Sequence, residues 1–275
     1  MPGCRDAGVG NLKGNKMTLL RLAAAGALVW LGLAGSAAAL PAIGDTTWDE
    51  PGDVLQTRLN ELLTDDITDI NAAQSGASLF TLTSAAGLNT LTLEIAGNRA
   101  TNTFGIYDPY AAHPKSTLVQ LFAGSAAPIS SISLSFSGLT PVVGGVSSGK
   151  TFTSATFGFY IGNIQNRPNT TFFSQASLNP NQEEHFVAIF GGGGNSFVTV
   201  LGGSDSFAAT DVFLAFEDLP LGKSDRDYND LVVLSRNLRA VPEPALLALL
   251  GTGLLGLGIV LRPRRTRSGR TAHAS

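Results

Sequence analysis

The chain has 275 residues, of which 44% are hydrophobic, 8% aromatic and 14% charged. This apolar content is enough for one well-packed domain and excludes a wholly disordered chain. The charge is unevenly spread, because residues 40–244 hold 9 Lys and Arg against 20 Asp and Glu, a net charge of −11. A surface of that sign disfavours nucleic acid as a partner and favours divalent cations.

The N-terminus has the three regions of a secretory signal peptide. Basic residues precede the apolar run 22–33, and the Ala-Ala-Ala sequence at 37–39 supplies a small-residue cleavage site. We therefore predict a signal peptide at 1–39, with Met17 as an alternative start. The only cysteine lies in this segment, so the exported protein would have no disulfide.

The C-terminus has a second apolar segment, at 245–261, which is long enough to be a short membrane helix. Arginines follow it and would keep that end on the cytoplasmic side of a membrane. We predict a sorting tail at 241–275 with a C-terminal membrane helix at 245–261. Its candidate sorting residues are Val241, Pro242, Glu243, Pro244, Arg262, Arg264 and Arg265.

This Val-Pro-Glu-Pro sequence, apolar segment and arginine cluster resemble the PEP-CTERM sorting signal of Gram-negative bacteria. In that family an exosortase, a membrane transpeptidase, recognises the tail, and such proteins commonly accompany exopolysaccharide production. The resemblance implies an exported protein that is anchored in the inner membrane during sorting and then reaches the cell surface or extracellular matrix. Its implied partners are an exosortase, the membrane and exopolysaccharide. An ordinary single-pass anchor is the alternative, with the same topology but no processing.

Residues 40–76 are predicted as an N-terminal helical or linker segment. Apolar residues recur at helical spacing between Asp53 and Leu63, and Asp53 is a candidate N-cap. No second helix is predicted before the C-terminal tail.

Residues 77–240 have the texture of an extracellular β-domain. Short runs rich in Thr, Ser, Phe, Val and Ile are interrupted by Gly, Asn or Pro about every ten residues, a spacing typical of sandwiches and barrels. Ile132, Leu134 and Phe136 alternate with serines, which indicates one buried face. The predicted fold class is all-β, an antiparallel, jelly-roll-like β-sandwich. The predicted strands are 79–83, 88–96, 102–107, 117–122, 129–137, 154–161, 185–190, 196–201, 212–216 and 231–235.

The strongest chemical signal is the sequence FEDLPLGKSDRDYNDLVV at 216–233. Its carboxylate and amide side chains are Glu217, Asp218, Asp225, Asp227, Asn229 and Asp230. Hard cations such as Ca²⁺ take about six to eight oxygen ligands, which loops at strand ends can gather. These six residues are therefore the predicted Ca²⁺ ligands.

This stretch is not an EF-hand, although Asp225, Asp227 and Asn229 match the start of one. Asp230 stands in place of the turn glycine and Arg236 in place of the last ligand. The alternative is a turn held only by side-chain-to-backbone hydrogen bonds and an Arg226 salt bridge.

The same stretch resembles an uncharacterised bacterial domain family whose signature is F-E-D-L-P…D-R-D-Y-N-D, found in secreted and PEP-CTERM proteins. Further pieces match, among them Asn-Thr-Phe-Gly-Ile-Tyr-Asp at 102–108, so that the likeness covers about 98–235. The resemblance implies a fold and this acidic cluster more than an activity.

No nucleophile elbow, zinc-protease motif or phosphate-binding loop is present in the sequence. We therefore expect a non-enzymatic protein with a Ca²⁺-binding β-domain, adhesive or structural in an exopolysaccharide context. The alternatives are a protein without any small ligand and a secreted hydrolase acting on polysaccharide. The hydrolase would use paired carboxylates such as Glu94 with Glu184 or Glu217.

Overall fold

The computed structural model describes residues 40–44, 54–93, 101–163, 171–192 and 206–242, all within one compact unit, Ala38–Glu243. The predicted signal peptide, the predicted strand 196–201 and the predicted membrane segment at 245–261 lie outside these residues. In the described part of the chain, no helix has the length and hydropathy needed to cross a membrane.

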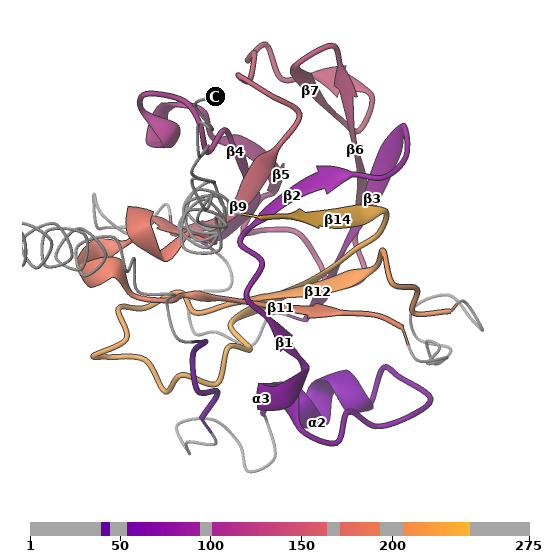
Figure 1. Cartoon of the computed structure of the whole chain (residues 1–275), viewed down its shortest axis with the longest axis vertical. Coiled ribbons are helices and arrows are strands. Elements are labelled where there is room, and N and C mark those ends of the chain that lie inside the picture. Colours follow the sequence, from indigo (N-terminus) through magenta and orange to yellow (C-terminus); the bar gives the residue numbers. More distant parts are fainter. Residues whose placement is uncertain (1–39, 45–53, 94–100, 164–170, 193–205, 243–275) are drawn as a thin grey trace, which may run out of the picture. The chain divides into compact units, whose positions relative to one another are not determined.

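Two antiparallel sheets build the domain (Figure 1). In the described ranges the larger sheet has eight strands, in the order β1-β11-β12-β13-β3-β6-β7-β8. They span β1 Gln74–Ser75, β11 Phe186–Phe190, β12 Val212–Phe216, β13 Leu231–Ser235, β3 Ala86–Leu93, β6 Ser131–Ser137, β7 Thr140–Val143 and β8 Val146–Ser147.

The smaller sheet runs β14-β2-β9-β4-β5, with β10 paired to β9. Its strands are β14 Leu238–Val241, β2 Leu79–Leu82, β9 Phe157–Asn163, β4 Asn102–Tyr107, β5 Val119–Phe122 and β10 Thr171–Phe173. Short 3-10 turns lie at η1 Pro114–Ser116, η2 Ala176–Leu178 and η3 Pro180–Gln182.

Phenylalanine side chains from both sheets meet in one core. The ring of Phe104 on β4 lies 5.4 Å from that of Phe159 on β9, and 6.1 Å from that of Phe216 in the opposite sheet. Phe186 on β11 packs against Phe216 at 4.8 Å between ring centroids. Aromatic pairs at these separations contribute beyond the area that they bury. The two sheets therefore form a β-sandwich, as the alternating sequence predicts.

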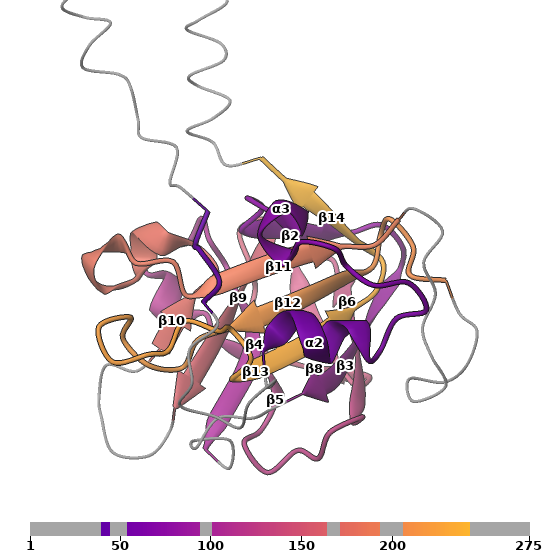
Figure 2. The same cartoon turned by 90° about the horizontal axis from the view of Figure 1, so that it is seen from below.

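Two short helices cover the outer face of the larger sheet (Figure 2). α2, Leu55–Asn60, buries Leu55 and Leu59, and α3, Ile70–Ala73, buries Ile70. These side chains pack against residues of β11, β12 and β13. Because the central strands are covered on both sides, they consist almost entirely of apolar residues, without the polar alternation of a solvent-facing strand.

The helix prediction needs two corrections. α2 is shorter than 53–63, and its N-cap is Val54, which makes no side-chain capping bond; Asp53 lies outside the described residues. A second helix, α3, exists although none was predicted. It is a single turn, too short to show a helical period, and the Asp69 side chain caps it by accepting hydrogen bonds from the N–H groups of Asn71 and Ala72.

The all-β, antiparallel prediction is confirmed, and the strands at 102–107, 212–216 and 231–235 have the predicted bounds. β1, β7, β8, β10 and β14 were not predicted, and none of them exceeds four residues. With them the described sheets are larger than those of an eight-stranded jelly roll. β14 includes Val241, which pairs with Leu79, so the sheet extends into the predicted sorting tail.

The sandwich core makes a first prediction. Phe104→Ala should lower the free energy of unfolding by about 3–5 kcal/mol, because the truncated ring leaves a cavity between the sheets. Val146→Ala is the control, since Val146 is 71% exposed and its truncation should change stability by less than about 0.5 kcal/mol. Urea unfolding of both variants measures the difference, and similar midpoints would contradict this core.

Candidate metal centre

The acidic residues lie in the loop that joins β12 to β13. These two strands pair in register up to Phe216 and Leu231, so the loop 217–230 begins and ends at adjacent points of the sheet. The N–H of Asp218 closes its base by donating to Asp230 Oδ2 at 2.8 Å. Pairing of the strands therefore brings carboxylates from both ends of the loop together, although thirteen positions separate Glu217 from Asp230 in the sequence.

Within the loop, the backbone takes an uncommon conformation. Arg226 and Tyr228 have φ values of 65° and 58°, in the left-handed region that residues other than glycine seldom adopt. Local hydrogen bonds hold it, from Arg226 N–H to Ser224 Oγ at 2.8 Å and from Asn229 N–H to Asp227 Oδ1 at 3.2 Å. Such strain persists only where the surroundings enforce it, and it is frequent at ligand sites.

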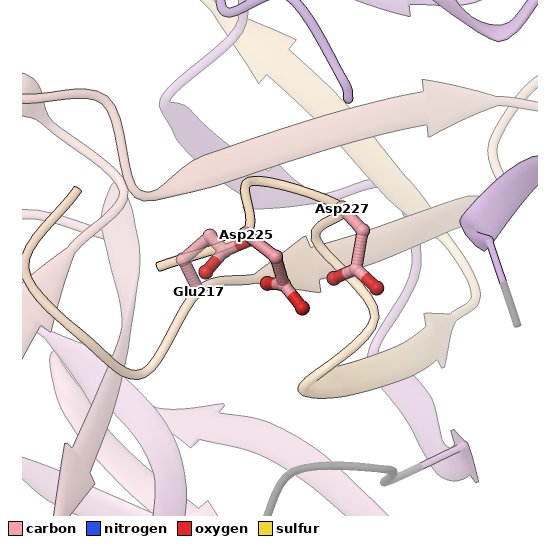
Figure 3. Close-up of side chains that lie close together, drawn as sticks. All are labelled: Glu217, Asp225 and Asp227. Carbon is pink, nitrogen blue, oxygen red and sulfur yellow. The ribbon is translucent and has the colours of Figure 1, made fainter. Parts of the chain in front are cut away.

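Three carboxylates converge in this loop. One carboxylate oxygen from each of Glu217, Asp225 and Asp227 lies within 4.8 Å of the other two (Figure 3). Glu217 and Asp227 are at most 1% exposed, and Asp225 is half-buried. Charges of one sign at this separation, partly removed from water, repel each other strongly. The arrangement has the oxygen chemistry that a hard divalent cation requires.

Glu217 is the most deeply buried member of this group. Burial raises its pKa to about 7, although its carboxylate accepts hydrogen bonds from Ser224 Oγ and from the N–H of Tyr228, which favour the charged form. Near neutral pH a proton thus competes for the position that a cation would take.

A second acidic pair lies beside the first. Burial, followed by the charges of Asp218 and Glu217, raises the pKa of Asp230 to about 9. Asp218 is 3% exposed, and its Oδ2 accepts a hydrogen bond of 2.7 Å from Asn102 Nδ2. Asn102 begins β4 in the opposite sheet, so this bond connects the acidic loop to the other half of the sandwich.

The loop is also fixed to its surroundings. Tyr228 is buried, and its hydroxyl donates to the carbonyl of Glu184 at 2.7 Å. Gly44 donates its N–H to the carbonyl of Arg226 at 2.8 Å, and a Cβ at Gly44 would lie only 3.1 Å from the carbonyl oxygen of Asp225. The segment 40–44 therefore passes directly against the loop.

The alternative to a metal site is a turn held by hydrogen bonds and an Arg226 salt bridge. Arg226 is exposed, its Nε donates to the carbonyl of Leu221 at 3.3 Å, and it forms no ion pair within the described chain. The Arg226 salt bridge of that alternative is therefore not formed among the described residues.

Histidine does not join the site as the structure stands. His185 is fully buried and stacks on Phe172 at 3.7 Å between ring centroids. Its Nε2 lies 3.5 Å from Glu183 Oε2, and burial lowers its pKa to about 4. The ring is therefore neutral at physiological pH.

The six predicted ligands thus fall into smaller groups. Glu217, Asp225 and Asp227 meet; Asp218 and Asp230 are joined through the Asp218 N–H. Asn229 directs its amide Nδ2 to Asp227 Oδ2. Of the sorting residues, Val241 ends β14 and Pro242 is exposed. Glu243, Pro244, Arg262, Arg264 and Arg265 lie outside the described residues, as does Glu94 of the hydrolase alternative.

The site analysis of the sequence overlooked Asn102 and Ser224. Ser224 lies inside the acidic stretch and could have been found as a hydrogen-bond donor. Asn102 is 116 positions from Asp218, and its only signal was its place at the start of a segment that resembles the domain family.

Comparison with known proteins identifies two segments of the chain. Residues 152–235 match a domain of unknown function, DUF4114, and residues 240–265 match the PEP-CTERM protein-sorting motif. The chain thus carries a DUF4114 domain followed by a PEP-CTERM motif, which confirms both resemblances, although the domain match begins at 152 and not at about 98. The sorting motif marks it as an exported protein of the kind that an exosortase sorts in Gram-negative bacteria. No curated protein and no solved structure shows significant similarity to it.

The raised carboxylate pKa values predict an unusual pH dependence in the absence of divalent cations. Asp230 binds more protons in the folded than in the unfolded chain, and so does Glu217 up to its pKa of about 7. Stability should therefore fall as pH rises. His185 acts in the opposite sense, but only below its ordinary pKa of 6.5. In chelator, the melting temperature should therefore decline between about pH 7 and 9.

Asp230→Asn tests this directly, because an amide at that position does not titrate. The variant should lose most of the decline between pH 7 and 9, whereas Asp66→Asn on the exposed surface should keep it. A decline of equal slope in wild type and Asp230→Asn would show that Asp230 is not the responsible group.

Proposed function

We propose that this exported protein is a non-enzymatic component of the cell surface or extracellular matrix, whose β-domain binds Ca²⁺ in the acidic loop. In this proposal the tail passes through the membrane during sorting, and the domain then adheres to exopolysaccharide or to neighbouring surface proteins. The observation that carries the proposal is the convergence of three carboxylate oxygens, from Glu217, Asp225 and Asp227, within 4.8 Å.

The kind of ligand atom favours Ca²⁺ over a transition metal. The converging groups are all carboxylates, whereas zinc and copper sites use cysteine and histidine. Both ring nitrogens of His185 are buried without a hydrogen-bond partner among the described residues, and the only cysteine, Cys4, precedes the predicted cleavage site. Asp225 and Asp230 are only half-buried, so water can reach this part of the loop, and Ca²⁺ often keeps water ligands.

The electrostatic cost of gathering these carboxylates supports a bound cation. The negative charge of the loop falls when Glu217 and Asp230 take up protons, and both do so at a pH well above the ordinary pKa of a carboxyl group. A divalent cation removes that cost without protonation, and it binds the folded chain alone, since the unfolded chain does not hold the ligands together.

A polysaccharide hydrolase is the second candidate, and the Glu217 pKa of about 7 favours it, because a general acid needs such a value. Two observations weigh against it. Glu217 is fully buried, and both of its carboxylate oxygens already accept hydrogen bonds from Ser224 and Tyr228. A sugar could not reach it without displacing these donors.

Metal binding predicts a Ca²⁺-dependent rise in melting temperature. At about 100 times the dissociation constant a ligand specific for the folded state adds about 2.7 kcal/mol. In a chain of this size that corresponds to a shift on the order of 5–10 °C. The full-length protein, purified in detergent, is melted in Ca²⁺ and in chelator.

The variant for this experiment is Asp225→Asn, Asp227→Asn, which keeps the side-chain shapes and removes two charges. It should lose the Ca²⁺-dependent shift, while the matched control Asp65→Asn, Asp66→Asn on the exposed surface should retain it. Identical melting of the wild type in Ca²⁺ and in chelator would rule out the metal site.

The adhesive function is tested separately, by incubating the purified protein with extracellular polysaccharide from its own cells. We expect retention on the polymer in Ca²⁺, release in chelator and no shortening of the polymer. Release of small saccharides that Glu217→Gln abolishes would instead establish the hydrolase.

A further inference from the structure

A buried amide lies directly against the acidic loop. Asn102 is 1% exposed, and its Nδ2 donates to Asp218 Oδ2 at 2.7 Å. Its other polar atom, Oδ1, is buried without a hydrogen-bond partner among the described residues. Buried amide oxygens are seldom left unpaired, because they lose their hydration and gain nothing in exchange.

Asn179 is a buried asparagine whose side chain is fully used within the fold. Its Oδ1 accepts from the N–H of Phe173 at 2.7 Å, and its Nδ2 donates to the carbonyls of Phe173 and Glu183. Every polar atom of that side chain is used. Among the described residues, the buried amide oxygens without a hydrogen-bond partner are those of Gln74, Asn102 and Asn229, and of these only the oxygen of Asn102 belongs to the smaller sheet.

The surroundings of Asn102 suggest what the oxygen is for. Its side chain points at Asp218, whose N–H is bonded to Asp230, and the charge of Asp218 acts on both Asp230 and Glu217. A neutral amide oxygen beside carboxylates is a common member of a Ca²⁺ ligand set. No such role follows for the amide nitrogen, which can only donate.

We propose that Asn102 and Asp218 form the inter-sheet side of the cation-binding site, with Asn102 Oδ1 as a neutral ligand supplied by the smaller sheet. The inference rests on the proposed binding of Ca²⁺ by the loop. In the structure, Nδ2 faces Asp218 and partly offsets its charge. When the cation binds, a half-turn of the amide about the Cβ–Cγ bond exchanges Nδ2 for Oδ1, and the two oxygens face the same ion.

The position of Asn102 gives this ligand a mechanical consequence. It begins β4, whereas Asp218 follows β12, so a shared ion connects the two sheets at one end of the sandwich. Binding then stabilises the packing of the sheets against each other as well as the loop. A site confined to residues 217–230 would leave the smaller sheet unaffected.

Two substitutions of Asn102 separate a ligand from a structural donor, using full-length protein melted in Ca²⁺ and in chelator. Asn102→Ala removes the oxygen, and should reduce the Ca²⁺-dependent shift in melting temperature by at least half. Asn102→Asp keeps an oxygen but adds a charge beside Asp218. It should melt below wild type in chelator, and Ca²⁺ should restore most of that loss. The control, Asn179→Ala, should lower the melting temperature equally in both conditions.

The outcomes separate this inference from the function on which it rests. If wild type shows no Ca²⁺-dependent shift, the proposed function itself fails. If wild type shows the shift and Asn102→Ala keeps all of it, the loop binds the cation without the smaller sheet and the inference is wrong. The Asn102→Asp variant also decides the matter if Asn102→Ala does not fold. Equal destabilisation in Ca²⁺ and in chelator would make Asn102 a hydrogen-bond donor only.

Discussion

The antiparallel pairing of β12 with β13 is the constraint from which the site follows. The two strands are central in the larger sheet and are buried on both faces, by the phenylalanine core on one side and by α2 and α3 on the other. Their register fixes where the loop between them begins and ends. Negative charge is thereby concentrated at the two ends of this loop. The carboxylates cannot move apart to reduce their repulsion, because the strands would then separate and expose their apolar side chains to water.

Several independent contacts hold the loop against this repulsion. Tyr228 fills a buried position and bonds to Glu184 in the segment before β11, Gly44 bonds to Arg226, and Asn102 bonds to Asp218 from the opposite sheet. Each contact comes from a different part of the chain. The geometry of the loop is therefore a property of the whole domain, and a ligand bound there is linked to the folding of the domain.

The sequence predicted the fold class and the location of the site because both depend on local patterns. β12 and β13 are nearly continuous apolar runs with clear ends, and the six acidic or amide residues fall in one short segment. β14 was missed because Leu238–Val241 is short and merges with the Val-Pro-Glu-Pro sequence of the tail. The one-turn helix α3 gave no periodicity to detect.

What the sequence could not predict are the relations that only tertiary structure creates. Nothing in the segment 217–230 indicates that Glu217 meets Asp225 and Asp227 while Asp218 faces another sheet. Asn102 is 116 positions from Asp218, and no sequence pattern indicates that its side-chain oxygen is buried without a hydrogen-bond partner in the described part of the chain. The left-handed conformations of Arg226 and Tyr228 were likewise not predictable from the sequence D-R-D-Y-N, since it contains no glycine.

The central claim is that the buried carboxylates of the loop hold a cation in exchange for protons. Calorimetric titration of the full-length protein with Ca²⁺ near pH 7.5, repeated in buffers of different ionisation enthalpy, measures binding and proton release together. The account predicts binding heats that depend on the buffer, because Asp230, and Glu217 in part, give up protons when the cation enters. Titrations without heat in every buffer, from protein shown to be folded, would contradict it.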